Sequence, residues 1–124
     1  MGTWGVALYS DDGARDARDA FRDLVGDGVE SSAATDRLVR DWGELVDDPD
    51  SGPPFWLALA DTQWRLGRLE DRVRERAIAV IDDGRDLERW RDRPRDLKKR
   101  AALLAKLREQ LLSAQPPAKR VPRR

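Results

Sequence analysis

Residues 53–66 read PPFWLALADTQWRL and contain the longest apolar run in a chain of 124 residues. Two prolines open the stretch, and proline is tolerated in the first turn of a helix because the N–H that it lacks has no partner there. The large apolar side chains that follow point in nearly every direction around a helix. A helix that is apolar on all sides is buried, so we expect this segment to be the centre of an all-α fold.

The sequence on either side predicts shorter helices that cover this centre, because apolar residues recur there at helical spacing and glycine or proline separates the segments. Loop-forming residues, DDPDSGPP, precede the central stretch. We expect helices over residues 12–25, from Ser31 or Ser32 to Val46, over 70–84, 86–90 and 95–112. The fold class is therefore all-α, a compact single-domain bundle of five or six short helices.

Residues 1–11 are expected to form an extended N-terminal strap. Trp4, Val6 and Leu8 would lie against the helical core, and Asp11 or Asp12 would cap the first helix, because a short carboxylate accepts the N–H groups of a first turn. Glycines interrupt the apolar residues, and no Lys or Arg precedes Arg15, so the stretch does not have the pattern of a secretion signal. No apolar run approaches the length of a membrane span, and we expect a cytoplasmic protein.

The helical domain is expected to occupy residues 1–112. The remaining residues, 113–124, read SAQPPAKRVPRR, with three prolines, four basic residues and no acidic one. Such a composition is typical of a disordered basic tail or linker.

The composition restricts the chemistry that the chain can perform. It contains no Cys and no His, which excludes disulfides, thiolate metal sites, thiol nucleophiles and the usual general base near neutral pH. Charged residues make up 39% of the chain. We expect no catalytic residue, no cofactor and no metal, although carboxylates could still bind Mg²⁺.

The net charge of zero conceals an asymmetry along the chain. Residues 1–61 contain 5 Arg and 14 Asp or Glu, a net charge of −9, whereas residues 62–124 contain 19 basic and 10 acidic residues, a net charge of +9. The split predicts either pairing between the two halves within one fold or a charged surface for a partner.

Asp61 is the strongest polar interruption of the central stretch. A carboxylate on a buried helix must be paired, exposed at an edge, or functional. Arg65, four residues on, would pair with it, and a contact with the N-terminal strap would serve equally. The functional alternative joins Asp61 with Tyr9, Asp11 and Asp12 around Mg²⁺ or a small polar ligand. The residues of the expected ligand pocket are Tyr9, Asp11, Asp61 and Trp64.

Five tryptophans and a basic second half suggest binding surfaces. Trp42, Trp56 and Trp64 lie at core spacing, whereas Trp90 stands among arginines, where it could form cation–π contacts. The basic amphipathic stretch 95–112 is most simply a bundle helix, with a partner groove or a membrane surface as alternatives. The residues of the predicted basic surface are Arg89, Arg91, Arg93, Arg95, Lys98 and Lys99.

The sequence contains three motifs: GTWG at residues 2–5, LYSDDGARDA at 8–17 and FWLALADTQWRLGRLEDRV at 55–73. In these motifs the chain resembles a group of small bacterial proteins that open with Gly-Thr-Trp-Gly and form a domain of unknown function. The resemblance implies no catalytic residue for this chain. It implies that a Pro-rich linker can connect such a domain to a further one.

We therefore expect a small cytoplasmic protein-interaction or accessory module, regulatory or immunity-like, without catalytic activity. Its partner would be a protein. Nucleic-acid binding through the basic C-terminal half and tail is the first alternative. A carboxylate site near Asp11, Asp12 and Asp61 is the second.

Overall fold

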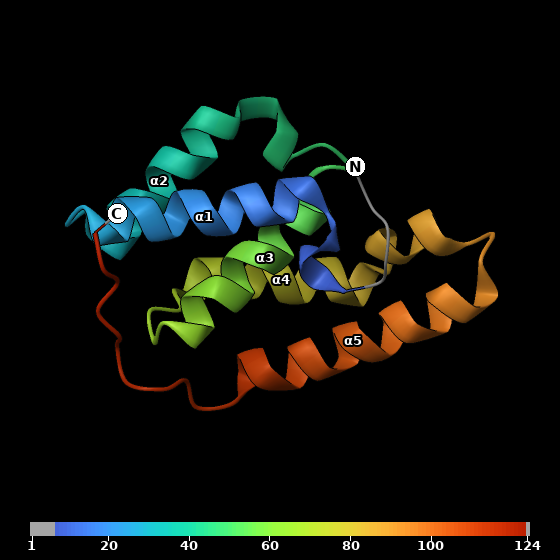
Figure 1. Ribbon diagram of the computed structural model, residues 1–124. Helices are drawn as coiled ribbons and strands as arrows, with labels where there is room; N and C mark the ends of the chain where they lie inside the picture. Colours follow the sequence, from blue (N-terminus) through green and yellow to red (C-terminus); the bar gives the residue numbers. More distant parts are fainter. Residues whose placement is uncertain (1–6, 124) are drawn as a thin grey trace.

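The computed structural model describes residues 7–123, and within that range the chain is all-α with no strand (Figure 1). It confirms a single bundle of short helices. In chain order the elements are the 3₁₀ helix η1 (Leu8–Ser10), α1 (Asp12–Gly26), α2 (Ser31–Trp42), the 3₁₀ helix η2 (Gly43–Val46), α3 (Gly52–Arg65), α4 (Asp71–Asp83), the 3₁₀ helix η3 (Arg85–Trp90) and α5 (Pro94–Leu112).

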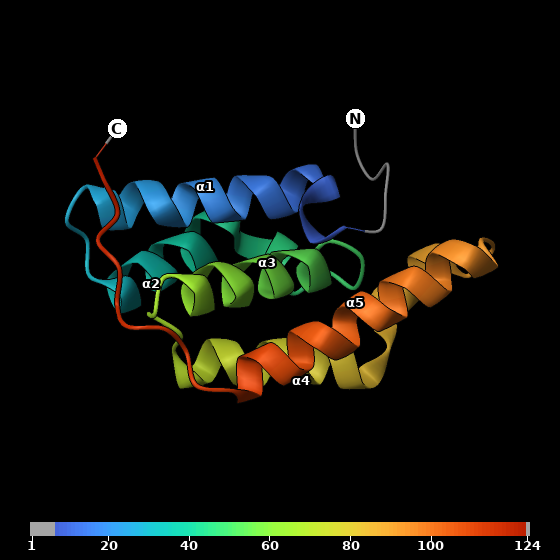
Figure 2. The same cartoon turned by 60° about the horizontal axis from the view of Figure 1, so that its bottom comes forward.

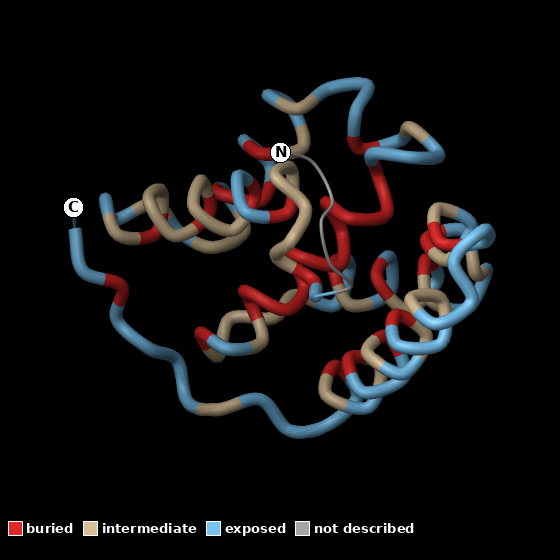
Figure 3. Tube along the Cα trace, turned by 45° about the vertical axis from the view of Figure 1, so that its right-hand side comes forward, coloured by how far each residue is buried: buried red, intermediate tan, exposed pale blue. Residues whose placement is uncertain are grey.

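Helix α3 is the centre of the bundle, as its sequence predicts. It contacts α1, α4 and α5, and every residue from Gly52 to Gln63 is buried. Figure 2 shows α1 on one side of α3, with α4 and α5 on the other. In Figure 3 the buried residues, drawn in red, gather in the middle of the bundle, around this helix. Because α3 has neighbours on all sides, its apolar residues need no common face.

Helix α1 packs one face on α3. Its buried residues, Ala14, Ala17, Phe21 and Val25, recur at helical spacing. Asp11 is the N-cap, and its Oδ1 accepts hydrogen bonds from the backbone N–H groups of Gly13 and Ala14 at 2.9 and 3.2 Å. The predicted aspartate cap is therefore confirmed, and it fixes the residue at which α1 begins.

The helix expected to reach Val46 ends four residues earlier, at Trp42, and continues as η2. Gly43 has a φ of +52°, a conformation that breaks an α-helix and that glycine adopts readily. The turn directs the Val46 carbonyl to Trp56, whose Nε1 donates to it at 2.9 Å.

The N-terminal strap is described only from residue 7. Leu8 is buried in the core as expected, but residues 8–10 form a 3₁₀ helix instead of an extended strand. Tyr9 packs against the same core. Trp4 and Val6, the other two residues assigned to the strap, lie outside the described residues.

The tail beyond Leu112 passes across one end of the bundle, from the end of α5 to the end of α1 (Figure 1). The Lys119 N–H donates to the Leu66 carbonyl at 2.8 Å, and Arg68 Nη2 donates to the Lys119 carbonyl at 2.8 Å. Val121 is buried. Hydrogen bonds to the Lys119 backbone and the buried Val121 hold this segment, and neither is visible in its composition.

Candidate functional site

The α3 residue Asp61 and the η1 residue Tyr9 form the centre of a polar cluster. The Tyr9 hydroxyl donates to Asp61 Oδ2 at 2.8 Å and lies 3.0 Å from Thr62 Oγ1. The Asp61 side chain is buried, and it lies on the face of α3 that η1 covers. The structure thus brings together two of the four residues of the expected ligand pocket.

Two further side chains satisfy the Asp61 carboxylate. Arg65 Nε lies 3.1 and 3.0 Å from its two oxygens, which confirms the predicted ion pair one helical turn away. From α5, Gln110 Nε2 donates to Asp61 Oδ1 at 2.7 Å. Donors from three elements therefore meet on one carboxylate, and the cluster connects η1 and α5 to α3.

Tyr9 holds its proton strongly in this setting. Burial disfavours the charged phenolate, and the neighbouring Asp61 carboxylate disfavours it further, so the pKa of Tyr9 is raised well above its ordinary value of 10.0. The Arg18 guanidinium, 4.7 Å from the centre of the Tyr9 ring, opposes this shift without cancelling it. The phenol is therefore a neutral hydrogen-bond donor at physiological pH.

The cluster forms one wall of a groove of about 540 Å³. Leu8 and Tyr9 of η1 and Asp61 and Arg65 of α3 line one side. The other side belongs to α5, through Lys99, Ala102, Leu103, Lys106, Leu107 and Gln110. We call this feature the α5 groove. Its dimensions fall in the range of protein sites that bind small molecules or a few side chains.

The α5 groove combines an apolar floor with a basic rim. Leu8 and Leu107 are buried at its base, while Lys99 and Lys106 are exposed at its edge. Within residues 7–123, neither lysine has an ion pair or hydrogen bond through its side chain. The Arg65 side chain is 65% exposed, and its Nη atoms have no hydrogen-bond partner in the same range. Lys99, Lys106 and the Nη atoms of Arg65 are therefore available at the rim to bind an anionic group.

The other carboxylates expected near Asp61 lie elsewhere. Asp11 caps α1 and forms an ion pair with Arg89, and Asp12 pairs with Arg15. Both line a separate cavity with Trp42 and Phe55. In the described part of the chain no three acidic side chains are placed to hold a metal ion. The arrangement around Mg²⁺ that joined Asp61 with Asp11 and Asp12 is therefore not formed.

Trp64 also lies outside the α5 groove, because it points toward the end of α5. Its Nε1 is 3.5 Å from the Ser113 carbonyl. It is partly buried at the edge of the core, as its spacing in the sequence predicts.

A second buried ionic cluster joins η3 to α5. Arg100 donates to Asp86 through Nε at 2.8 Å and Nη2 at 3.1 Å, and both residues are 1% exposed. Arg89 bridges the Asp86 and Asp11 carboxylates at 2.8 and 2.9 Å. Sequence reasoning missed this cluster, although Arg100 occupies a core position, in step with Leu104 and Leu107 along α5.

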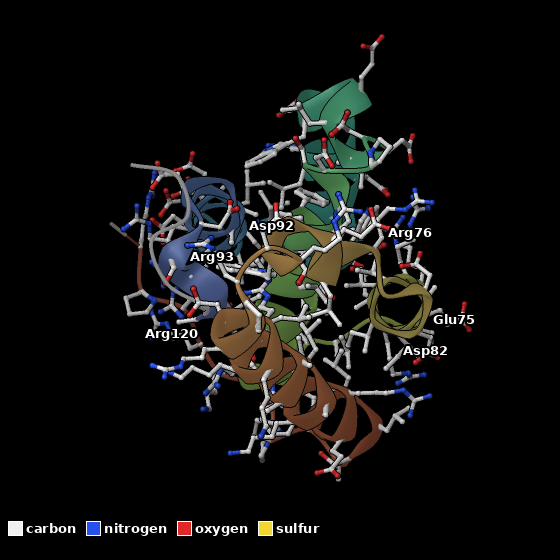
Figure 4. The ribbon with its side chains drawn as sticks, turned by 90° about the vertical axis from the view of Figure 1, so that its right-hand side faces the viewer. Glu75, Arg76, Asp82, Asp92, Arg93 and Arg120 are labelled. Atoms are coloured by element: carbon white, nitrogen blue, oxygen red, sulfur yellow. The ribbon has the colours of Figure 1, made fainter. Side chains whose placement is uncertain are left out.

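The predicted basic surface is therefore smaller than expected. Arg89 does not belong to it, because its side chain is only 21% exposed and is paired in the buried cluster. Trp90 is also buried, and the guanidinium groups of Arg89, Arg93 and Arg100 lie 5.4, 4.9 and 5.9 Å from the centre of its ring. The members that remain exposed are Arg91, Arg93, Arg95, Lys98 and Lys99. Figure 4 shows Arg93 beside Asp92 at the turn before α5, so acidic residues interrupt this surface.

The charge split of the sequence is partly resolved by pairing between the halves. Within residues 7–123, arginines of the second half bind aspartates of the first in five ion pairs: Arg65–Asp61, Arg72–Asp36, Arg76–Asp47, Arg89–Asp11 and Arg123–Asp27. The lysines of the α5 groove do not take part in this pairing within the described range.

None of the described helices is both long enough and apolar enough to cross a membrane. No protein-family model, curated protein or solved structure matches the chain. The function must accordingly be argued from the geometry of the α5 groove and the charges around it.

Proposed function

We propose that the protein is a non-catalytic interaction module, accessory or regulatory in a cytoplasmic setting, and that a protein partner docks in the α5 groove. The observation that carries the proposal is the coincidence of an apolar floor with two lysines, Lys99 and Lys106, that have no ion pair within residues 7–123, beside the exposed Nη atoms of Arg65, whose Nε is paired with Asp61. Apolar surface supplies affinity in protein complexes, and charges at its rim supply orientation and association rate.

The polar cluster in the wall supports binding better than it supports chemistry. Asp61 already accepts hydrogen bonds from Tyr9, Arg65 and Gln110, and Tyr9 retains its proton. A general base needs a lone pair that is directed at a substrate and a pKa near the working pH. The cluster instead holds η1, α3 and α5 in one arrangement, which preorganises the groove before a partner arrives.

Site-specific photo-cross-linking tests the proposal. A cross-linking amino acid replaces Ala102, which is exposed and lines the α5 groove, and in a matched variant it replaces Ala105, which is exposed on the same helix outside the groove. In an extract of the native cells we expect a discrete protein adduct from position 102 alone. The combined change Lys99→Glu/Lys106→Glu should abolish this adduct. Equal adducts from both positions, or an adduct that survives the charge reversal, would contradict the proposal.

Nucleic-acid binding is the second candidate, because Arg91, Arg95 and Lys98 are exposed and have no ion pair within residues 7–123. It predicts binding to a duplex or single strand that weakens steeply between about 50 and 200 mM salt, since phosphate contacts release counterions. The interrupting carboxylates Asp92 and Asp96 argue for a weak interaction. An affinity that does not change over this salt range would eliminate the candidate.

A further inference from the structure

We infer that the occupant of the α5 groove is an acidic amphipathic helix of the partner, lying along α5 with its apolar face on the groove floor. The inference rests on the proposed function and adds the chemical class of the partner. It is argued from the spacing of the α5 side chains, from the balance of charge at the rim and from the backbone groups that the fold offers.

The side chains of α5 that line the groove repeat every seven residues. Lys99 and Lys106 are one heptad apart, and so are Leu103 and Gln110. Seven residues of α-helix advance about 10 Å, close to two turns, so the two lysines stand on the same edge of the groove with Leu103 between them. Charged residues that flank an apolar seam at this spacing select a partner helix of opposite charge in coiled coils.

The charge balance of the rim excludes a basic occupant. Among the described residues that line the groove, Asp61 is the single acidic one, and the Nε of Arg65 already lies against it. Two lysine charges and the outward side of the Arg65 guanidinium therefore remain uncompensated. A partner helix with Glu or Asp two turns apart would meet the lysines, and a third carboxylate could bind the Nη atoms of Arg65 in a forked arrangement.

The backbone of the groove favours a helix over an extended peptide. An extended peptide gains affinity by adding a strand to an open sheet edge, and residues 7–123 contain no strand. The peptide groups of α5 that face the groove are already hydrogen bonded within the helix. Only side chains are available for contact, and an amphipathic helix presents its apolar and acidic side chains together on one face.

A designed peptide provides the probe. It is an alanine-rich helix of about 18 residues, five turns, with leucines along one face and glutamates seven residues apart on the same edge. A hydrocarbon staple keeps it helical, because isolated helices of this length are marginally stable in water. The comparison peptide carries lysines in place of the glutamates. Sodium dodecanoate serves as a second probe, since a fatty carboxylate combines the same two chemistries in a small molecule.

The full-length chain should bind the acidic peptide at least about 10-fold more tightly than the basic one at low salt. Lys99→Glu/Lys106→Glu should weaken binding of the acidic peptide by about 10-fold or more, because the attraction between each lysine and a peptide glutamate becomes a repulsion between two glutamates. Lys98→Glu, which reverses one lysine at an exposed position outside the groove and so makes half of that charge change, should change the affinity by less than about 2-fold. Ala102→Trp should block binding, whereas Ala105→Trp should not.

The inference is overturned if both peptides bind equally, if Lys98→Glu weakens binding as much as the groove variants, or if dodecanoate binds more tightly than the acidic peptide. These failures differ from a failure of the proposed function. If position 102 still forms a groove-dependent adduct and the cross-linked segment of the partner is neither helical nor acidic, the protein-binding function stands and the acidic helix is rejected.

Discussion

Arg100 and Asp86 form a bidentate ion pair in the interior of the bundle, with Nε–Oδ2 and Nη2–Oδ1 distances of 2.8 and 3.1 Å. The pair connects α5 to η3, and Arg89 extends it to the cap of α1 through Asp11. The cluster therefore joins two consecutive elements, η3 and α5, to the start of α1, which is distant in sequence. Its position also sets the angle at which α5 leaves η3, on which the α5 groove depends.

Removing one member of this pair should destabilise the fold strongly. Arg100→Met leaves the buried Asp86 carboxylate with fewer donors, and we expect a loss of about 3–5 kcal/mol in the free energy of unfolding. The double variant Asp86→Leu/Arg100→Met should lose less than Arg100→Met alone, because it leaves no uncompensated charge at this position. Urea denaturation measures both. Arg108→Met, which removes an ion pair exposed on the surface, is the control and should change the midpoint little. An equal effect of Arg108→Met and Arg100→Met would contradict this account.

The tail should contribute to stability through the turn at Gly67. Gly67 and Gly84 both have positive φ, of 69° and 73°, but only Gly67 lies against the tail. A Cβ at Gly67 would come within 2.6 Å of the Pro117 backbone, whereas a Cβ at Gly84 would meet no atom within 4 Å. Gly84→Ala should therefore cost about 1 kcal/mol from backbone strain, and Gly67→Ala should cost clearly more.

Truncation after Ser113 tests the origin of this difference. In the truncated chain the two glycine variants should lose similar amounts of free energy, as a double-mutant cycle by thermal or urea denaturation would show. If the excess cost of Gly67→Ala persists without the tail, that excess does not come from a clash with the tail.

Stability should decrease above about pH 10 because of Tyr9. The pKa of Tyr9 is raised in the folded protein above its value of 10.0, so the unfolded chain releases this proton first. The stabilisation is fully present below the unfolded pKa and is lost as pH rises toward the folded pKa. Because the chain contains a single tyrosine, tyrosinate absorbance reports this group alone.

Tyr9→Phe isolates the contribution of the hydroxyl. We expect this variant to lose about 1–2 kcal/mol at neutral pH, since a hydrogen bond to a charged group is removed. The difference in stability between wild type and variant should then shrink between about pH 10 and pH 12. A constant difference across this range would show that Tyr9 ionises equally easily in both states.

A third buried group of polar side chains connects α2, α3 and the start of α4, and its hydrogen bonds should contribute to stability. Gln63 is fully buried and donates to Thr35 Oγ1 at 2.8 Å and to Glu70 Oε2 at 3.1 Å. Thr35→Val preserves the shape of the side chain but removes one partner of the buried amide, and should cost about 1–3 kcal/mol. Ala33→Val on the exposed side of α2 is the control. Urea denaturation that finds no difference between the two variants would contradict the assigned hydrogen bonds.

The sequence by itself determined the helical class, the central position of α3, an aspartate cap on α1 from Asp11 or Asp12, and the Asp61–Arg65 pair. All of these follow from interactions within a few residues: apolar periodicity, proline and glycine signals, and contacts one turn apart. The end of α2 before Gly43 was harder to predict from the sequence, because a glycine destabilises a helix by only about 1 kcal/mol and does not by itself end one.

Only the tertiary structure decided which distant side chains meet. Tyr9 contacts Asp61, as expected. Asp11 does not join them, because it caps α1 and pairs with Arg89. Gln110, near the other end of the chain, donates a hydrogen bond to Asp61. The α5 groove depends on the angle between α5 and α3, which buried ion pairs and packing set and which no local pattern encodes. Local sequence specifies helices through short-range hydrogen bonds and periodicity, whereas a site between helices depends on how their faces pack.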